Sequence, residues 1–153
     1  MRKRQSRVGL FIGVFIVIIL IIVMIKSMFF SAEEQAQRVV DEFYTYEQEG
    51  NFTDSWELFH PFMKERWEKS TYINDRAHVF MGHFGAETFD YSIEYLDKVE
   101  KWRMAKDKKP FKEAYHFQVL QMYKGKYGKF NFEQDVYVVK NKDSWGILWD
   151  YQQ

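Results

Sequence analysis

The chain has 153 residues and no cysteine, which excludes disulfides, thiolate metal sites and cysteine nucleophiles. Its 22 basic and 22 acidic side chains balance, but residues 1–30 carry five basic residues and no acid, so the remainder is mildly acidic. A nucleic-acid partner is therefore not expected.

Residues 8–25 form an uncharged, mostly apolar stretch of 18 residues. As an α-helix it would span about 27 Å, close to the hydrocarbon thickness of a bilayer. Cleaved secretion signals have a shorter apolar stretch followed by small residues, whereas Phe29 and Phe30 stand at that place here. We therefore favour a permanent signal anchor, with removal as a cleaved signal as the alternative.

Basic residues cluster before this stretch, which orients the N-terminus toward the cytoplasm. The predicted organisation has a cytoplasmic basic tail over residues 1–7 and a transmembrane helix over residues 8–25 in contact with the lipid bilayer. A short connection over residues 26–30 and an extracellular domain over residues 31–153 follow. The predicted localisation is a single-pass protein of a bacterial cell membrane, part of the cell envelope.

The extracellular part begins with helical signals. Ser31 and Glu34 have the spacing of a capping box, which opens a helix. Apolar residues then recur at helical spacing up to Gly50, where a left-handed residue can end the helix.

Three shorter helical segments are expected next. One should begin at Thr53 or Asp54 and be interrupted before Pro61, because the residue before a proline disfavours helix geometry. A second continues after the proline. A third should follow Ser70 and end near Gly85.

From Thr88 the apolar period changes to two, which predicts strands. Further strands are expected over residues 111–123 and 130–140, joined by the glycine-containing hairpin KGKYGK. After the turn NKDS a last strand presents one apolar face, formed by Trp145, Ile147, Trp149 and Tyr151. The predicted fold class is α+β, with about three helices packed on a curved antiparallel sheet of about four strands.

The segment VVDEFYTYEQEGNFTDSWELF and the closing hairpin VYVVKNKDSWGILWDY resemble the nuclear-transport-factor-two-like (NTF2-like) superfamily, over about residues 31–151. The resemblance implies a cone-shaped domain in which a long helix and two shorter ones pack into a strongly bent sheet, often with a cavity at the open end. Behind its anchor the chain is also similar to extracellular modules of Gram-positive wall-associated proteins and to bitopic assembly factors of conjugation machines.

Enzymes of this superfamily place Asp, His or Tyr side chains in the cavity for proton abstraction. Asp41, Tyr115 and His116 could approach such a cavity, but no spacing distinguishes them from other surface or core residues, so catalysis is not predicted. Aromatic residues make up 20% of the chain, and core filling accounts for them first. If they line a ligand pocket instead, the expected walls are Tyr91, Tyr115, Phe117, Trp145 and Trp149.

No cofactor and no metal site are predicted. His78 and His83 are five positions apart, and an α-helix would turn their side chains about 140° away from each other. Zinc ligands on a helix are instead four positions apart and share a face.

The segment KVEKWRMAKDKKPFK, residues 98–112, holds seven basic and two acidic residues and is expected to form a loop between strands. It is either a solvated hairpin tip or a surface that contacts anionic headgroups or wall polymers. The basic residues in question are Lys98, Lys101, Arg103, Lys106, Lys108, Lys109 and Lys112.

The sequence thus favours a membrane-anchored extracellular binding or assembly module without catalytic activity. Its partner would be a membrane-proximal protein or a cell-wall polymer, with self-association left open. The alternative is a small-ligand-binding or enzymatic domain with an aromatic-lined pocket.

Overall fold

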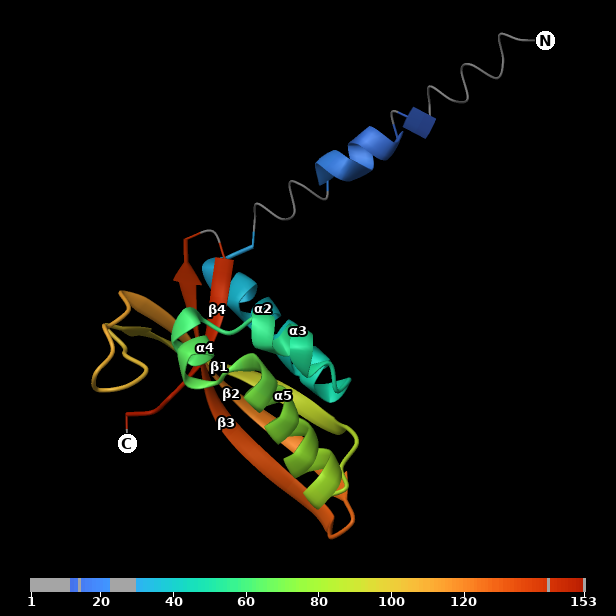
Figure 1. Cartoon of the computed structure of the whole chain (residues 1–153). Coiled ribbons are helices and arrows are strands. Elements are labelled where there is room, and N and C mark those ends of the chain that lie inside the picture. Colours follow the sequence, from blue (N-terminus) through green and yellow to red (C-terminus); the bar gives the residue numbers. More distant parts are fainter. Residues whose placement is uncertain (1–11, 14, 23–29, 143, 153) are drawn as a thin grey trace, which may run out of the picture. The chain divides into compact units, whose positions relative to one another are not determined.

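A computed structural model describes residues 12–13, 15–22, 30–142 and 144–152 of the chain (Figure 1). The chain divides into two compact units, Met1–Glu34 and Gln35–Gln153. Within the described ranges, no helix is both long and apolar enough to cross a membrane. The predicted tail over residues 1–7 lies outside the described residues, as do parts of the predicted span over residues 8–25 and most of the predicted connection.

Helices come first in the domain. α2 spans Ala32–Gln48, α3 Phe52–Glu57, α4 Pro61–Arg66 and α5 Lys69–Arg76, and α5 continues into a π-helix, η1, over Ala77–His83. The predicted capping box is confirmed at the start of α2. The Ser31 N–H donates to Glu34 Oε2 at 2.8 Å, and the Glu34 N–H donates to Ser31 Oγ at 3.1 Å.

Two of the short helices, α3 and α4, begin at side-chain caps. α3 begins at Phe52, slightly before the predicted start, because the side chain of Asn51 accepts a hydrogen bond from the backbone of Asp54. His60 caps α4 in the same way, since its Nδ1 accepts the Phe62 N–H at 3.1 Å and Pro61 occupies the first helical position. The predicted interruption before Pro61 is therefore confirmed.

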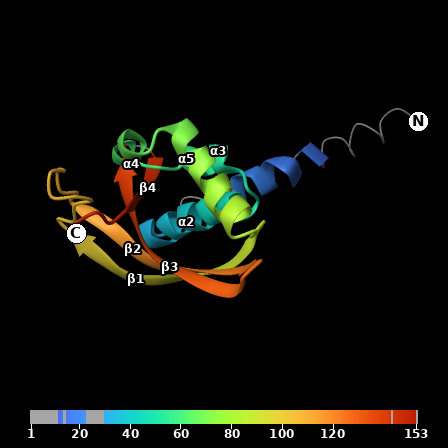
Figure 2. The ribbon, with the colours of Figure 1, turned by 60° about the horizontal axis from the view of Figure 1, so that its bottom comes forward.

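Four antiparallel strands follow in the order β1-β2-β3-β4, and together with the helices they confirm the predicted α+β class. They span Phe89–Glu100, Glu113–Gly125, Gly128–Asn141 and Ser144–Trp149. The sheet is bent, and α2 lies in its hollow with the shorter helices beyond it (Figure 2). The two-residue turn between β2 and β3 is closed by the Gly125–Gly128 pair, and Gly128 has a φ of 107° that other residues rarely adopt.

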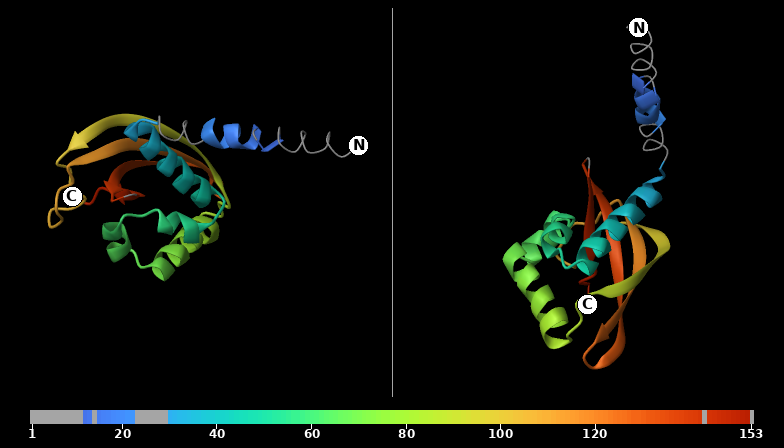
Figure 3. Two further views of the ribbon diagram at one scale, coloured as in Figure 1. Left: turned by 90° about the horizontal axis from the view of Figure 1, so that it is seen from above. Right: turned by 90° about the vertical axis from the view of Figure 1, so that its right-hand side faces the viewer.

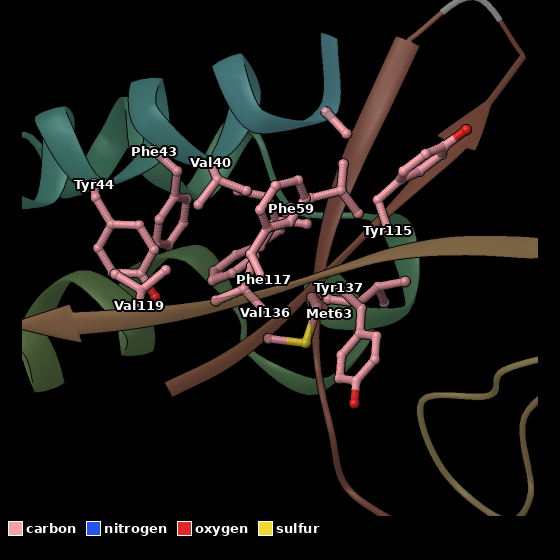
Figure 4. Close-up of a cluster of buried hydrophobic side chains, with 14 of the residues drawn as sticks. Val40, Phe43, Tyr44, Phe59, Met63, Tyr115, Phe117, Val119, Val136 and Tyr137 are labelled. Carbon is pink, nitrogen blue, oxygen red and sulfur yellow. The ribbon is translucent and has the colours of Figure 1, made fainter. Parts of the chain in front are cut away.

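The core lies between α2 and the sheet. α2 buries Ala36, Val40, Phe43 and Tyr44, whose spacing places them on one helical face. In Figure 4 the α2 side chains point toward the sheet, where Phe117, Val119 and Val136 are fully buried. This packing fixes α2 across the strands.

The short helices are tied to the edge strand β4 by backbone hydrogen bonds. The His60 N–H donates to the Ile147 carbonyl at 3.0 Å, and the Ile147 N–H donates to the Leu58 carbonyl at 2.9 Å. Gly146 permits this approach, because a Cβ at that position would lie 2.9 Å from His60 Cα. The segment between α3 and α4 is thereby held against the sheet, which positions α5 as well.

Candidate functional site

A cleft of about 250 Å³ lies between the end of the helical layer and the last two strands. Figure 3 shows the ribbon from two further sides, with the helices lying over one face of the bent sheet. The lining residues come from the C-terminal end of α4, from α5 and η1, and from β3 and β4; they are Trp67, Tyr72, Asp75, Arg76, Phe80, Phe132, Gln134 and Trp149.

Aromatic rings form most of the cleft wall. Trp149 is held edge-on against Phe59 with ring centroids 5.1 Å apart. Trp67 is fixed by its indole N–H, which donates to the Tyr151 hydroxyl at 2.9 Å. Phe132 projects from β3 and is 44% exposed, although it is a large apolar side chain. Rigid rings that remain partly exposed offer apolar contact area to a ligand.

A buried carboxylate supports the cleft from behind. Glu47 on α2 accepts hydrogen bonds from Ser55 Oγ at 2.5 Å, Tyr72 Oη at 2.6 Å and Arg76 Nε at 2.6 Å. The side chain of Glu47 has no exposed surface, and that of Arg76 is 15% exposed. Three helices are thus joined at one charged group.

The charges in this cluster stabilise each other. Burial is the largest single influence on Arg76 and alone would lower its pKa, but the Glu47 carboxylate together with Tyr72 and Tyr123 raises the pKa above its ordinary value. Burial, and then the negative charge of Glu47, raise the pKa of Tyr72 well above its ordinary value. Arg76 therefore stays cationic and Tyr72 stays a neutral donor at physiological pH.

The cleft continues outward into an acidic mouth. This outer part has a volume of about 590 Å³ and shares Phe132, Gln134 and Trp149 with the inner part. Its other lining residues are Glu133, Asp135, Asp150 and Gln152, so it has three acids and no base among the described residues. Asp75 adds a further carboxylate to the inner part. The mouth favours a positively charged group.

One polar group beside the cleft lacks a partner. The indole N–H of Trp149 is buried and donates to no acceptor among the described residues. Buried donors are satisfied in the great majority of cases by protein, water or ligand. A hydrogen-bond acceptor on a bound molecule is one way to satisfy Trp149.

Of the five aromatic residues predicted as pocket walls, Trp149 lines this cleft. Phe117 is fully buried in the core, and Tyr115 is buried against Trp145, with ring centroids 5.6 Å apart. Tyr91 bonds to α2 through its hydroxyl. Trp145 borders a separate depression beside His60 and Pro61. The structure does not bring these five side chains together around one cavity.

Sequence patterns alone did not identify most of the cleft residues. Tyr72, Phe80 and Phe132 carry the ordinary signature of core positions, namely apolar residues at helical or alternating spacing. Phe132 is partly exposed only because the helical layer is short and does not extend over it. The alternation along β3 places Phe132 on the same face as Val136, and this was the one available signal.

The residues considered for proton abstraction lie outside the lining of the cleft. Asp41 accepts a hydrogen bond from Tyr91 Oη at 2.9 Å. His116 lies between two carboxylates, with Nδ1 3.2 Å from Asp97 Oδ1 and Nε2 2.9 Å from Asp135 Oδ1. Both ring nitrogens of His116 are thus engaged.

The expectation that His78 and His83 diverge was wrong. Their Nε2 atoms are 2.9 Å apart. The reason is that residues 77–83 form a π-helix, in which five positions make close to one turn, whereas the expectation assumed an α-helix.

The basic segment over residues 98–112 is a loop between β1 and β2 at its centre, as predicted, but it is anchored to the sheet. Trp102 is buried and stacks on Tyr137 with centroids 4.0 Å apart. Two of its lysines form ion pairs, Lys98 with Glu113 and Lys108 with Glu65. Exposed cationic side chains of this loop include Lys101, Arg103, Lys106, Lys109 and Lys112.

The cleft therefore combines rigid aromatic walls, a buried arginine–glutamate pair and an acidic mouth. Such a surface suits a molecule with an apolar or flat body and a positive charge. The chain matches no protein-family model, and no curated protein matches its sequence.

Proposed function

We propose that this chain is a non-catalytic binding module whose cleft takes a small amphipathic cation, or the equivalent side chain of a partner protein. The aromatic lining is the single observation that carries the proposal, with Trp67, Phe132 and Trp149 forming partly exposed walls. Binding an apolar body there would remove these rings from water.

The charge of the mouth supports a cationic ligand over an anionic one. Glu133, Asp135 and Asp150 line the outer part, and Asp75 lines the inner part. Arg76 is the basic lining residue of the inner part, and its charge is matched by Glu47 at 2.5 Å. An ammonium group would meet carboxylates at the mouth, of which Asp135 also contacts His116 Nε2 at 2.9 Å, and aromatic faces farther in.

A binding role is favoured over catalysis because the ionisable groups behind the cleft are tied to one another. A general base needs a pKa near the working pH and a free lone pair aimed at its substrate. Glu47 instead accepts hydrogen bonds from three side chains and has no exposed surface. These contacts support a structural role for Glu47.

We also propose that residues 8–25 anchor the module in a membrane, so that it works at the outer bilayer surface. The 18 uncharged residues and the basic residues before them support this location. Helices followed by a bent antiparallel sheet support the NTF2-like resemblance and its cone-shaped domain. A membrane-proximal protein or a cell-wall polymer that carries amines would then be a suitable partner.

A matched series of small probes tests the cleft. Benzyltrimethylammonium, its neutral isostere neopentylbenzene and phenylmethanesulfonate have similar bodies and different charges. We expect the cation to quench Trp fluorescence in a saturable way and to bind more tightly than the neutral probe, with the anion weakest. Added salt should reduce the difference between the probes.

Phe132→Ala should weaken binding of the cation several-fold, because it removes a ring of the cleft wall that is 44% exposed and so offers contact area to a ligand. Tyr127→Ala is the matched control, since Tyr127 is an aromatic residue at the tip of the β2–β3 hairpin and is 79% exposed. Equal binding of the three probes, or equal losses in both variants, would overturn the proposal.

A further inference from the structure

The two histidines of the π-helix η1 point their distal nitrogens at each other. His78 Nε2 and His83 Nε2 are 2.9 Å apart, and the rings meet edge to face with centroids 4.5 Å apart. Both side chains are exposed to solvent. In the absence of a metal one ring donates its N–H to the other, so one nitrogen must carry the shared proton.

The helix type creates this pair. The Phe84 N–H donates to the Val79 carbonyl at 3.1 Å, which is the i to i+5 hydrogen bond of a π-helix. In this register positions five apart lie much closer in angle than they do in an α-helix. In an α-helix the same two side chains would be about 140° apart. The π-helical conformation of η1 is therefore what brings the two histidines together.

The distance between the nitrogens fits two adjacent ligands of one metal ion. Metal–imidazole bonds are about 2.0–2.1 Å long. Two nitrogens 2.9 Å apart at that bond length subtend an angle of about 90° at the metal, the cis angle of square-planar or octahedral geometry. Tetrahedral coordination would need the nitrogens about 3.3 Å apart.

We propose that His78 and His83 form a two-imidazole site for a late first-row divalent cation, Cu²⁺ or Ni²⁺. These ions favour tetragonal nitrogen coordination and stand at the strong end of the divalent affinity series. Among the described residues no third His, Cys, Asp or Glu completes a metal cluster, so water fills the other positions. The ion displaces the shared proton, and binding weakens as pH falls below the histidine range.

The test uses the full chain without a histidine tag, in detergent because of its apolar N-terminal stretch. Isothermal titration with Cu²⁺ and with Ni²⁺ should show one site, and Mg²⁺ should not compete, because it prefers oxygen ligands. Electron paramagnetic resonance of the Cu²⁺ form should show coupling to two imidazole nitrogens. His78→Gln and His83→Gln should each weaken binding at least tenfold and leave one coupled nitrogen or none.

His116→Gln is the matched control, because it removes a histidine of β2, outside η1. It should leave both the affinity and the two-nitrogen signal unchanged. Since His78 and His83 are exposed, circular dichroism should show that both variants stay folded. An affinity within twofold of the unchanged chain, after His78→Gln and His83→Gln are combined in one chain, would overturn the proposal. A spectrum that changes with His116→Gln alone would overturn it as well.

Discussion

Arg76 Nη2 lies 2.5 Å from Glu47 Oε2, and this ion pair joins α5 to α2 across 29 positions of the chain. The carboxylate is completely buried, and Tyr72 and Ser55 supply the other hydrogen bonds to it. The pair holds in place the helix that carries one wall of the aromatic cleft. Its contribution is to position α5, since a buried ion pair is by itself weak evidence for stability.

Replacing one partner of this ion pair should strongly destabilise the domain. Glu47→Gln leaves the Arg76 charge buried without a counter-charge, and we expect a loss of about 3–5 kcal/mol in the free energy of unfolding. Urea denaturation measures this loss. Glu57→Gln is the control, because Glu57 pairs with Lys64 and Lys69 at the surface, and it should change stability far less.

The double variant Glu47→Leu with Arg76→Met separates charge from packing. Removing both charges together should recover part of the stability lost in Glu47→Gln, because no buried charge is left unpaired. If the double variant is less stable than Glu47→Gln, the loss comes from packing and the electrostatic account is wrong.

The stability of the domain should fall between pH 6.5 and 4 through His60. Burial lowers the pKa of His60 to about 4, below its ordinary value of 6.5. As pH falls, the unfolded chain therefore binds a proton at His60 before the folded chain does, and this favours unfolding. The stability contributed by neutral His60 is fully present above pH 6.5 and is lost toward pH 4. We expect about 1–2 kcal/mol, less than the full shift implies because solvent screens part of it.

His60→Asn tests this pH dependence. Asparagine can also cap α4, where His60 Nδ1 now accepts the Phe62 N–H, but it does not titrate. The variant should be less stable at pH 7, because the ring contacts with Phe62 and Phe111 are lost. The difference between the two proteins in unfolding free energy should shrink from pH 7 to pH 4, and a constant difference would contradict the role of His60.

Gly146→Ala should destabilise the domain where β4 meets the segment before α4. The added Cβ would lie 2.9 Å from His60 Cα, a backbone atom that cannot move aside cheaply. Overpacking of this kind costs about 1–3 kcal/mol. Gly82→Ala is the control, because the nearest atom to its new Cβ is 3.7 Å away. Thermal unfolding of both variants should show a lower midpoint for Gly146→Ala only.

The basic segment over residues 98–112 should bind anionic membranes through the cationic side chains that form no ion pair with the described part of the chain. We expect the chain from Ser31 onward to sediment with vesicles that contain phosphatidylglycerol and not with pure phosphatidylcholine. Reversing Lys106 and Lys109 to Glu should weaken binding at least tenfold, since each basic residue near the surface contributes about 1 kcal/mol. The control reverses Lys124 and Lys129 on the β2–β3 hairpin, which makes the same charge change elsewhere in the chain. An equal loss of vesicle binding in this control would show that the loop has no specific role in membrane binding.

Local signals predicted the element order well. The Ser31–Glu34 capping box, the interruption before Pro61 and the switch to alternating apolar residues near Thr88 each depend on neighbours in the chain, and the structure confirms all three. By contrast, η1 could not be told from an α-helix by its apolar spacing. The divergence of His78 and His83 was therefore mispredicted.

By itself the sequence determined the α+β class and the faces of its helices and strands, because backbone geometry and the avoidance of water by apolar side chains act over a few neighbouring residues. Only the tertiary structure decided which aromatic residues are covered. Phe117 lies beneath α2 and has no exposed surface, whereas Phe132 lies beyond the helical layer and borders the cleft. Coverage depends on where elements distant in the chain come to pack, and this information is not present in any local stretch of residues.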